Sequence, residues 1–308
     1  MDRRPLARGL VALLIASLVL ASAGTTLAYE PDAQPNLGNG QVTSPAESRT
    51  VVGVQGFHLD GTGDAKKPPR LVGVTRDAGT AWVYDGTDRA SWYYDVEPLP
   101  DGDLLVTSIS QRETVVLRMD RETREVEWRE RLDIHDTHDV DLLPNGNLVV
   151  ANMRNYNETT GVPNDRVFVY DRETDEITWE WYFRNHYPND TDGGFNADWS
   201  HVNDVDPVDD GSAVLVSPRN FDQVIVVNRS TDEIELRLGA DDEYEILHEQ
   251  HNPDLIRGED GSVSILVADS ENDRVVEYER DCEGPDGVVA GDPGECEWDR
   301  TWELTGLN

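Results

Sequence analysis

The sequence is poor in positive charge. Against 62 acidic residues it has 26 basic ones, and its only lysines are Lys66 and Lys67. The formal net charge of -36 excludes nucleic acid as a favourable partner, because the phosphates would be repelled. Such an acid excess is common in disordered chains, but regular hydrophobic runs separated by turn residues indicate a folded protein with an acidic surface. That surface favours a halophilic protein, because counterions at high salt screen the repulsion between carboxylates.

Several kinds of catalytic machinery are also missing. The chain has no Gly-x-Ser-x-Gly elbow and no phosphate-binding glycine loop. Acyl transfer and nucleotide-dependent chemistry therefore lack their usual parts. No helical pattern of normal length follows residue 50, so the domain is expected to be all-β.

The N-terminus is typical of a targeting segment. Three arginines precede the apolar run 10–23, and the small residues that end at Ala28 resemble a cleavage site. We expect residues 1–28 to be a signal peptide or an N-terminal membrane anchor, since the run is just long enough to span a bilayer. Residues 29–50 are predicted to be a linker and 51–308 a single domain. The protein is then exported, and is extracellular or anchored at the outer cell surface.

Export would allow two modifications, a disulfide and N-glycosylation. Cys282 and Cys296 flank a segment rich in Gly, Pro and Asp, and in an exported protein this arrangement favours a disulfide. A metal site built from these two cysteines alone would lack ligands. Three glycosylation sequons also become usable, at Asn157, Asn189 and Asn228.

From residue 51 the chain repeats itself. Residues 95–106 and 138–149 share a strand, a Pro-Asp-Gly or Pro-Asn-Gly turn and a second strand, and hairpins of similar sequence follow. The turn glycine of each unit recurs at Gly102, Gly146, Gly211 and Gly261. Repeats of four short strands at this spacing predict the blades of a β-propeller.

The predicted blades do not close a ring. An irregular strand pair at 51–84 is followed by units near 91–132, 138–183, 201–238 and 251–304. Propellers usually seal the ring with strands from both termini, because unpaired blade edges are exposed otherwise. The chain ends where another blade would begin, so we expect the last blade to be missing, incomplete or open.

One predicted hairpin gathers polar side chains. Its first strand places His201, Asn203 and Val205 on one side, and Arg219 leaves its second strand. Because a tight turn brings the far ends of antiparallel strands together, the three polar groups should meet at one rim of the sheet. An imidazole, a carboxamide and a guanidinium in one place indicate an anion site, although a capped hairpin with a surface arginine has the same sequence features.

Histidines recur at the starts of three successive units. They are His135 and His138, His201, and His251, and we interpret His138, His201 and His251 as standing at the same phase of the repeat. Since the innermost strands of a propeller line one channel, His138, His201 and His251 are predicted to share a site. A metal cluster that includes His135 is the competing interpretation. A guanidinium among cation ligands is unfavourable, so we predict no metal ion and no cofactor.

The predicted set can carry group transfer. Arg219 offers a fork of donors to a tetrahedral oxyanion, and Asn203 adds a neutral donor. One neutral imidazole can attack while another gives or takes a proton.

These residues resemble the motifs of a known family. The run 198–203, Arg219 eighteen residues after His201, and residues 249–252 are similar to motifs of the arylsulfate sulfotransferases, in a haloarchaeal-type member. The likeness extends over most of residues 90–280. It implies a six-bladed propeller that moves a sulfuryl group from an aryl sulfate donor to a phenolic acceptor. It also implies a ping-pong mechanism without a nucleotide (PAPS) donor.

The resemblance also implies residue roles. His251 would be the nucleophile that becomes sulfohistidine, and His201 and His138 would be acid/base or sulfate-orienting groups. Arg219 and Asn203 would bind the sulfuryl oxygens. The alternative is an exported scaffold propeller that recognises anionic or glycan ligands without catalysis.

Overall fold

A computed structural model describes most of the predicted domain. The described residues are 49–54, 57–58, 65–67, 69–86, 90, 92–110, 113–134, 136–281 and 296–306. They belong to one compact unit. The targeting segment 1–28, nearly all of the linker, His135 and Cys282 lie outside these residues, so the predictions made for them stay predictions. Within the described ranges, no helix is long and apolar enough to cross a membrane.

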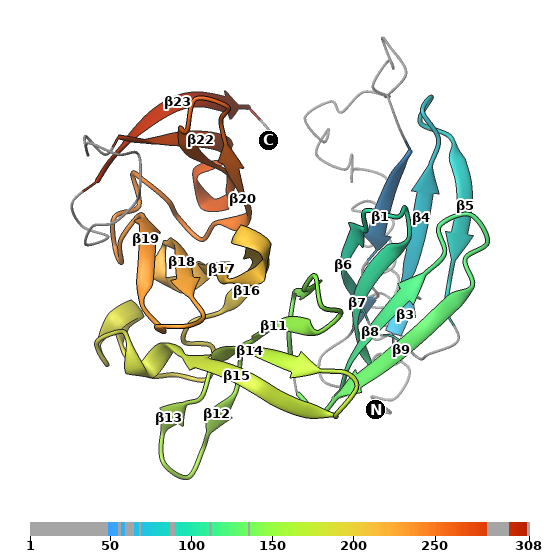
Figure 1. The fold of residues 1–308 in the computed structure, drawn as a ribbon, viewed down its shortest axis with the longest axis horizontal. Coiled ribbons are helices and arrows are strands. Elements are labelled where there is room, and N and C mark those ends of the chain that lie inside the picture. Colours follow the sequence, from blue (N-terminus) through green and yellow to red (C-terminus); the bar gives the residue numbers. More distant parts are fainter. Residues whose placement is uncertain are drawn as a thin grey trace, which may run out of the picture. The chain divides into compact units, whose positions relative to one another are not determined.

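The described chain forms five antiparallel sheets in sequence order (Figure 1). The first three consist of β1 (Thr50–Val54), β4 (Arg70–Val74) and β5 (Thr80–Tyr84); β6 (Trp92–Pro98), β7 (Leu104–Ser110), β8 (Glu113–Met119) and β9 (Val126–Leu132); and β10 (Val140–Leu142), β11 (Leu148–Asn152), β14 (Arg166–Asp171) and β15 (Glu176–Tyr182). The fourth and fifth consist of β16 (Val202–Val208), β17 (Ala213–Pro218), β18 (Val224–Asn228) and β19 (Ile234–Leu238); and β20 (His251–Arg257), β21 (Val263–Asp269), β22 (Arg274–Asp281) and β23 (Glu297–Thr305).

Smaller elements complete the described structure. Two strand pairs stand apart from the sheets: β2 (Phe57–His58) with β3 (Ala65–Lys67), and β12 (Tyr156–Asn157) with β13 (Val162–Pro163). The helices of the described residues are five short 3-10 turns: η1 (Phe183–Asn185), η2 (Thr191–Gly193), η3 (Asp209–Gly211), η4 (Arg219–Phe221) and η5 (Ser270–Asn272).

The prediction of an all-β propeller is confirmed, but the expected six blades with an incomplete last one are wrong. The described residues form five sheets, and the last of them has all four strands. Its outer strand β23 pairs with β22 from Arg274 opposite Thr305 to Asp281 opposite Glu297. The final stretch of the chain therefore completes the fifth sheet and does not begin another. The three-stranded sheet is the first.

The repeated turns have the predicted geometry. At Gly146 the amide donates to the carbonyl of Leu143 at 2.8 Å, and the amide of Leu143 donates to that of Asn147 at 2.9 Å. The φ of Gly146 is 85°, in the region that only glycine adopts without steric cost. The turn therefore fixes which residues of β10 and β11 lie opposite each other.

Each inner strand of the last four sheets has one extra residue near its start. The pairing register shifts by one residue there, which is the mark of a β-bulge. The shift falls between Tyr93 and Asp95, between Asp136 and Val140, between Val202 and Asp204, and between His251 and Asp254. A bulge re-aims the side chains that precede it, so the simple alternation of a strand does not continue across these positions.

The bulge overturns one prediction for β16. His201, Asn203 and Val205 were expected to share one side of the strand by alternation. Val202 and Val205 instead both pack into the same buried cluster, because the extra residue between them changes the phase. Asn203 is the residue that the register skips.

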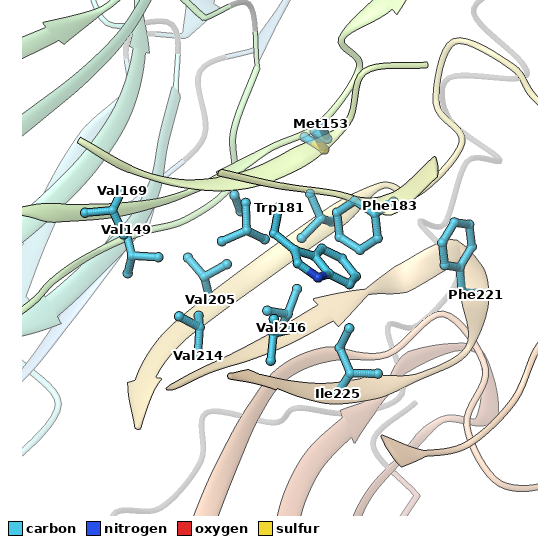
Figure 2. Packing of buried hydrophobic residues seen from close by; sticks show 14 of the residues in the cluster. Val149, Met153, Val169, Trp181, Phe183, Val205, Val214, Val216, Phe221 and Ile225 are labelled. Carbon is cyan, nitrogen blue, oxygen red and sulfur yellow. The ribbon is translucent and has the colours of Figure 1, made fainter. Parts of the chain in front are cut away.

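Apolar residues of the third and fourth sheets pack against each other (Figure 2). Trp181 of β15 and Val149 of β11 belong to the same cluster as Val216 of β17 and Ile225 of β18, and all four are buried. Burial of this apolar surface stabilises the pairing of neighbouring sheets, and it holds in place the inner strands that carry the polar side chains described below.

We expect Ile225→Ala to lower the free energy of unfolding by about 2–5 kcal/mol, because it leaves a cavity between two packed sheets. Ile225 is fully buried, whereas Ile177 of β15 is 44% exposed. Ile177→Ala removes the same atoms at the surface and should cost less than about 1 kcal/mol. Denaturant unfolding in molar salt measures both. Equal losses for the two variants would contradict the packing described here.

The charge of -36 predicts that stability depends on salt. At low ionic strength the carboxylates repel one another over a longer range, so the folded state should lose stability. The melting temperature should fall steadily as salt is lowered from molar to dilute concentration, as followed by circular dichroism. A melting temperature that does not change over this range would refute the prediction.

Candidate active site

Three predicted site histidines and the predicted arginine come together in the structure. The rings of His138 and His201 meet edge to face, with centroids 5.1 Å apart and planes at 76°. The charges of Arg219 and His201 act on His251, and His251 in turn acts on His138. Residues far apart in the sequence therefore form one cluster at the starts of three inner strands.

The orientation of His201 is set by a carboxylate. Its Nδ1 lies 2.9 Å from Oδ2 of Asp198 and 3.3 Å from Nη1 of Arg219. One ring nitrogen cannot donate to a carboxylate and accept from a guanidinium at once, so the shorter, charge-assisted bond fixes the tautomer. Nδ1–H donates to Asp198, and Nε2 carries the lone pair.

A guanidinium that was not predicted supports this carboxylate. Arg154 donates from Nε to Oδ1 of Asp198 at 2.7 Å and from Nη1 to Oδ2 of Asp136 at 2.6 Å. Although burial acts in the opposite direction, the hydrogen bonds of His201 and Arg154 hold the pKa of Asp198 well below its usual range. Asp198 is therefore ionised near neutral pH, and its carboxylate holds the ring of His201 in place.

Arg219 begins η4, directly after β17. It forms an ion pair with Glu249 and donates from Nη1 to Oδ1 of Asn220 at 3.1 Å. Its buried Nε–H has no hydrogen-bond partner among the described residues. Burial lowers the pKa of the guanidinium, because the charged form loses solvation. A donor without an acceptor beside three imidazoles is where an anion would be stabilised.

His251 opens β20 and is half-buried. Its Nδ1 lies 2.8 Å from Oγ of Ser270. When Nδ1–H donates to this hydroxyl, Nε2 keeps its lone pair. Burial, followed by the charges of Arg219 and His201, lowers the pKa of His251 to about 4. His251 is therefore neutral near pH 7 and can act as a nucleophile.

His138 stacks on Tyr94, with ring centroids 4.1 Å apart. Burial and the charges of His201 and Arg154 lower the pKa of His138 to about 3, so its ring is neutral over the physiological range. Because two guanidinium groups lie near the three imidazoles, the cluster is a poor place for a metal cation.

Asn203 is buried between two inner strands. Its Nδ2 donates to the carbonyl oxygen of Gln250 at 2.9 Å, which links β16 to the residue before β20. Its Oδ1 has no hydrogen-bond partner among the described residues. One amide N–H is therefore used for structure, and one remains for another acceptor.

The histidines do not stand at equivalent positions. His201 and His251 come three residues before Asp204 and Asp254, which occupy the same place in the register. His138 directly precedes Asp139, and so corresponds to Asn203. The expected common phase is therefore wrong for His138. It joins the cluster from the neighbouring third sheet, from the position directly before the aspartate and not from the position three residues before it.

Sequence reasoning missed the residues that hold the cluster in place: Arg154, Asp136, Asp198, Glu249 and Ser270. Asp198 could have been found, because it precedes His201 by one turn in the quoted motif. Arg154 and Ser270 follow β11 and β21 and have no local pattern that points to the site. His201 and Glu249 also have positive φ angles of 41° and 48°. Residues other than glycine rarely adopt this backbone conformation, and they keep it only where the surrounding structure holds them in place.

Comparison with known proteins identifies the family. The model of the Arylsulfotransferase (ASST) family matches residues 63–252. The chain belongs to this family. The match includes all five predicted site residues, and family membership supports a sulfotransferase enzyme that acts on an aryl sulfate donor and a phenol acceptor. No curated protein matches the chain.

Solved structures similar to this family member share little sequence identity with it. The β-propeller domain of Cps50 (Swd1) from Myceliophteria thermophila is 13% identical, with a TM-score of 0.48 over 85% of this chain and 76% of that one. Hydrazine synthase from Kuenenia stuttgartiensis is 12% identical, with a TM-score of 0.44 over 80% of this chain and 68% of that one.

We expect the imidazole of His251 to titrate near pH 4 in this arylsulfotransferase family member. Burial lowers its pKa most, Arg219 and His201 lower it further and Glu271 raises it, so Arg219→Gln should move the titration part of the way toward the ordinary value near pH 6.5. Ring-proton chemical shifts followed by NMR measure the midpoint. Arg257→Gln is the control, because Arg257 lies in the same strand but pairs with exposed Asp209. A midpoint that Arg219→Gln leaves unchanged would contradict this electrostatic coupling.

Proposed function

We propose that this protein transfers a sulfuryl group from an aryl sulfate to a phenol by a ping-pong mechanism, with His251 as the carrier. The observation that carries the proposal is the arrangement of His251. Its Nδ1 is held by Ser270, its Nε2 is left with a lone pair, and the charge of Arg219 acts on the ring. A neutral nucleophile beside a cation suits attack on an anionic sulfate ester.

In the first half-reaction Nε2 of His251 attacks sulfur and an N–S bond forms. The S–O bond to the aryl group breaks, and its electron pair leaves with the phenolate. In this cycle His201 carries a second proton on Nε2 when the donor binds and gives it to this oxygen, while Asp198 accepts from Nδ1–H and keeps the ring in place. No nucleotide is needed, since the aryl sulfate itself supplies the sulfuryl group.

The second half-reaction reverses these roles. The acceptor phenol attacks sulfur, its proton passes to Nε2 of His201, and the N–S bond breaks to restore neutral His251. His138 stays neutral throughout and can donate a hydrogen bond to a sulfuryl oxygen. The same residue thus acts as acid and then as base, as microscopic reversibility requires when donor and acceptor are both phenols.

The developing charge on the sulfuryl oxygens needs preorganised donors. Arg219 can provide its unpaired Nε–H, and Asn203 the amide N–H that Gln250 does not use. Both side chains are fixed by other contacts, so little reorganisation accompanies the reaction. Arg219 and Arg154 are the guanidinium groups of the site, and both are also ion-paired, Arg219 with Glu249 and Arg154 with Asp136 and Asp198.

We further propose that the reaction takes place outside the cell and in concentrated salt. Support comes from the targeting pattern of residues 1–28 and from the charge of -36. A phenolic acceptor in that location would come from the environment or the cell surface.

The proposal is tested with a chromogenic aryl sulfate in molar salt, with and without an added phenol. Without acceptor, mass spectrometry of the wild-type protein should find the sulfuryl group on His251. His251→Ala should lose both labelling and turnover. Arg219→Ala should slow the transfer by about 10²–10³-fold, which corresponds to about 3 kcal/mol of transition-state stabilisation.

His186→Ala is the matched control, because this histidine stacks on Trp181 and lies outside the cluster. It should keep full activity. A sulfuryl group found on another residue would reassign the nucleophile. Full activity in His251→Ala would overturn the mechanism, and the absence of any transfer by the wild-type protein would leave a propeller that only binds anions.

A further inference from the structure

A second polar centre lies further along the same inner strands. The structure contains a cavity of about 190 Å³ that is lined by carboxylates and by part of the start of β20. Its acidic lining residues are Asp95, Glu97, Asp139, Asp204, Asp206 and Asp254. The lining contains no Arg, Lys or His. The cavity therefore concentrates negative charge without a cationic side chain to balance it.

The carboxylates form two levels that follow the repeat. Asp95, Asp204 and Asp254 are the first residues after the bulges of β6, β16 and β20. Asp139 holds the same place in the third sheet, because its carbonyl accepts from the amide of Ala151. Each of four sheets thus contributes one carboxylate at the same height.

Two residues further along the strands, a second level follows. One carboxylate oxygen from each of Glu97, Asp141 and Asp206 lies within 4.8 Å of the other two. These side chains come from β6, β10 and β16. Oxygen atoms from three sheets are therefore close enough to bind one ion together.

An independent observation at Asp204 points to a ligand. This side chain is only 5% exposed, and it lines the cavity. Its Oδ2 has no hydrogen-bond partner among the described residues. A buried carboxylate oxygen without a partner is costly, and buried charges in proteins are normally paired or bound to metal ions.

The donor set selects the kind of ion. All the donors are carboxylate oxygens, which favour a hard cation over zinc or copper. Calcium accepts six to eight oxygens in a flexible geometry, whereas magnesium requires a small and nearly ideal octahedron. Ligands spread over two levels of four strands fit the larger and more tolerant ion. We propose that this cavity binds a calcium ion, which ties together the inner strands of four sheets.

Protons are the alternative way to relieve the repulsion. Without the ion, burial and neighbouring carboxylates raise the pKa of Asp95 to about 6, of Asp206 to about 7 and of Glu97 to about 9. Calcium would displace these protons, so protons and calcium compete for the same carboxylate oxygens.

The ion would also affect the histidine cluster. His138 directly precedes Asp139, and Asn203 directly precedes Asp204. Fixing these two carboxylates fixes the backbone that carries the cluster. This inference does not depend on the chemistry proposed for His251, because calcium binding is measured without any sulfate ester.

The experiment uses the full chain in molar KCl, which suppresses loose binding of cations to the acidic surface. Protein dialysed against a chelator is titrated with calcium chloride in a calorimeter, and its melting temperature is followed in parallel. We expect one site per chain, a higher melting temperature with calcium than without, and weaker binding of magnesium.

Asp204→Asn should weaken calcium binding by more than about tenfold, since it removes a ligand charge. Asp210→Asn is the control, because Asp210 is exposed just after β16 and the substitution changes the net charge equally. Glu97→Gln gives the same test should Asp204→Asn not fold. The proposal is overturned if wild-type protein binds no calcium in KCl, if magnesium binds as tightly, or if Asp204→Asn and Glu97→Gln both bind like Asp210→Asn.

Discussion

The structure depends on the convergence of inner strands from successive sheets. Polar side chains come together along β6, β16 and β20 and at the start of β10. The apolar cores lie elsewhere, between neighbouring sheets. Charge that would be diluted on a surface is concentrated here. At the strand starts, Arg154 and Arg219 are balanced by carboxylates that pair with them, while the cavity beyond the bulges is lined by carboxylates without a cationic side chain. A cluster that can bind an anion and a cavity lined by anionic side chains thus lie within a few residues of each other along the same strands.

The sequence was sufficient to predict the fold class, because the turn glycines and the strand pattern repeat at readable intervals. It also predicted which sheets carry His138, His201 and His251. These predictions rest on local rules, namely alternation, turn chemistry and the common role of inner strands. The five repeat units match the five sheets, but the expectation of six blades with an incomplete last one was wrong. Whether the last strand completes a sheet or begins another depends on its pairing with β22, and such pairing joins residues that are far apart in the sequence.

The partners of the site residues could not be predicted. Arg154 reaches Asp198 across 44 positions of the sequence, and Asn203 reaches the carbonyl of Gln250 across 47. Contacts of this kind follow from the packing of neighbouring sheets and leave no local pattern. The bulges had the same effect on a smaller scale. One extra residue in β16 put Val202 and Val205 in the same core, which no reading of strict alternation would allow.

The extra residue in each inner strand also separates two parts of the molecule. Side chains before the bulge are no longer held to the alternation of the strand beyond it. The position at which three sheets carry His138, Asn203 and Tyr94 therefore accepts a ring, an amide or a phenol, while the next residue stays an aspartate in each. The side chain before the aspartate therefore differs from sheet to sheet, whereas the carboxylate that lines the cavity is the same in all four sheets.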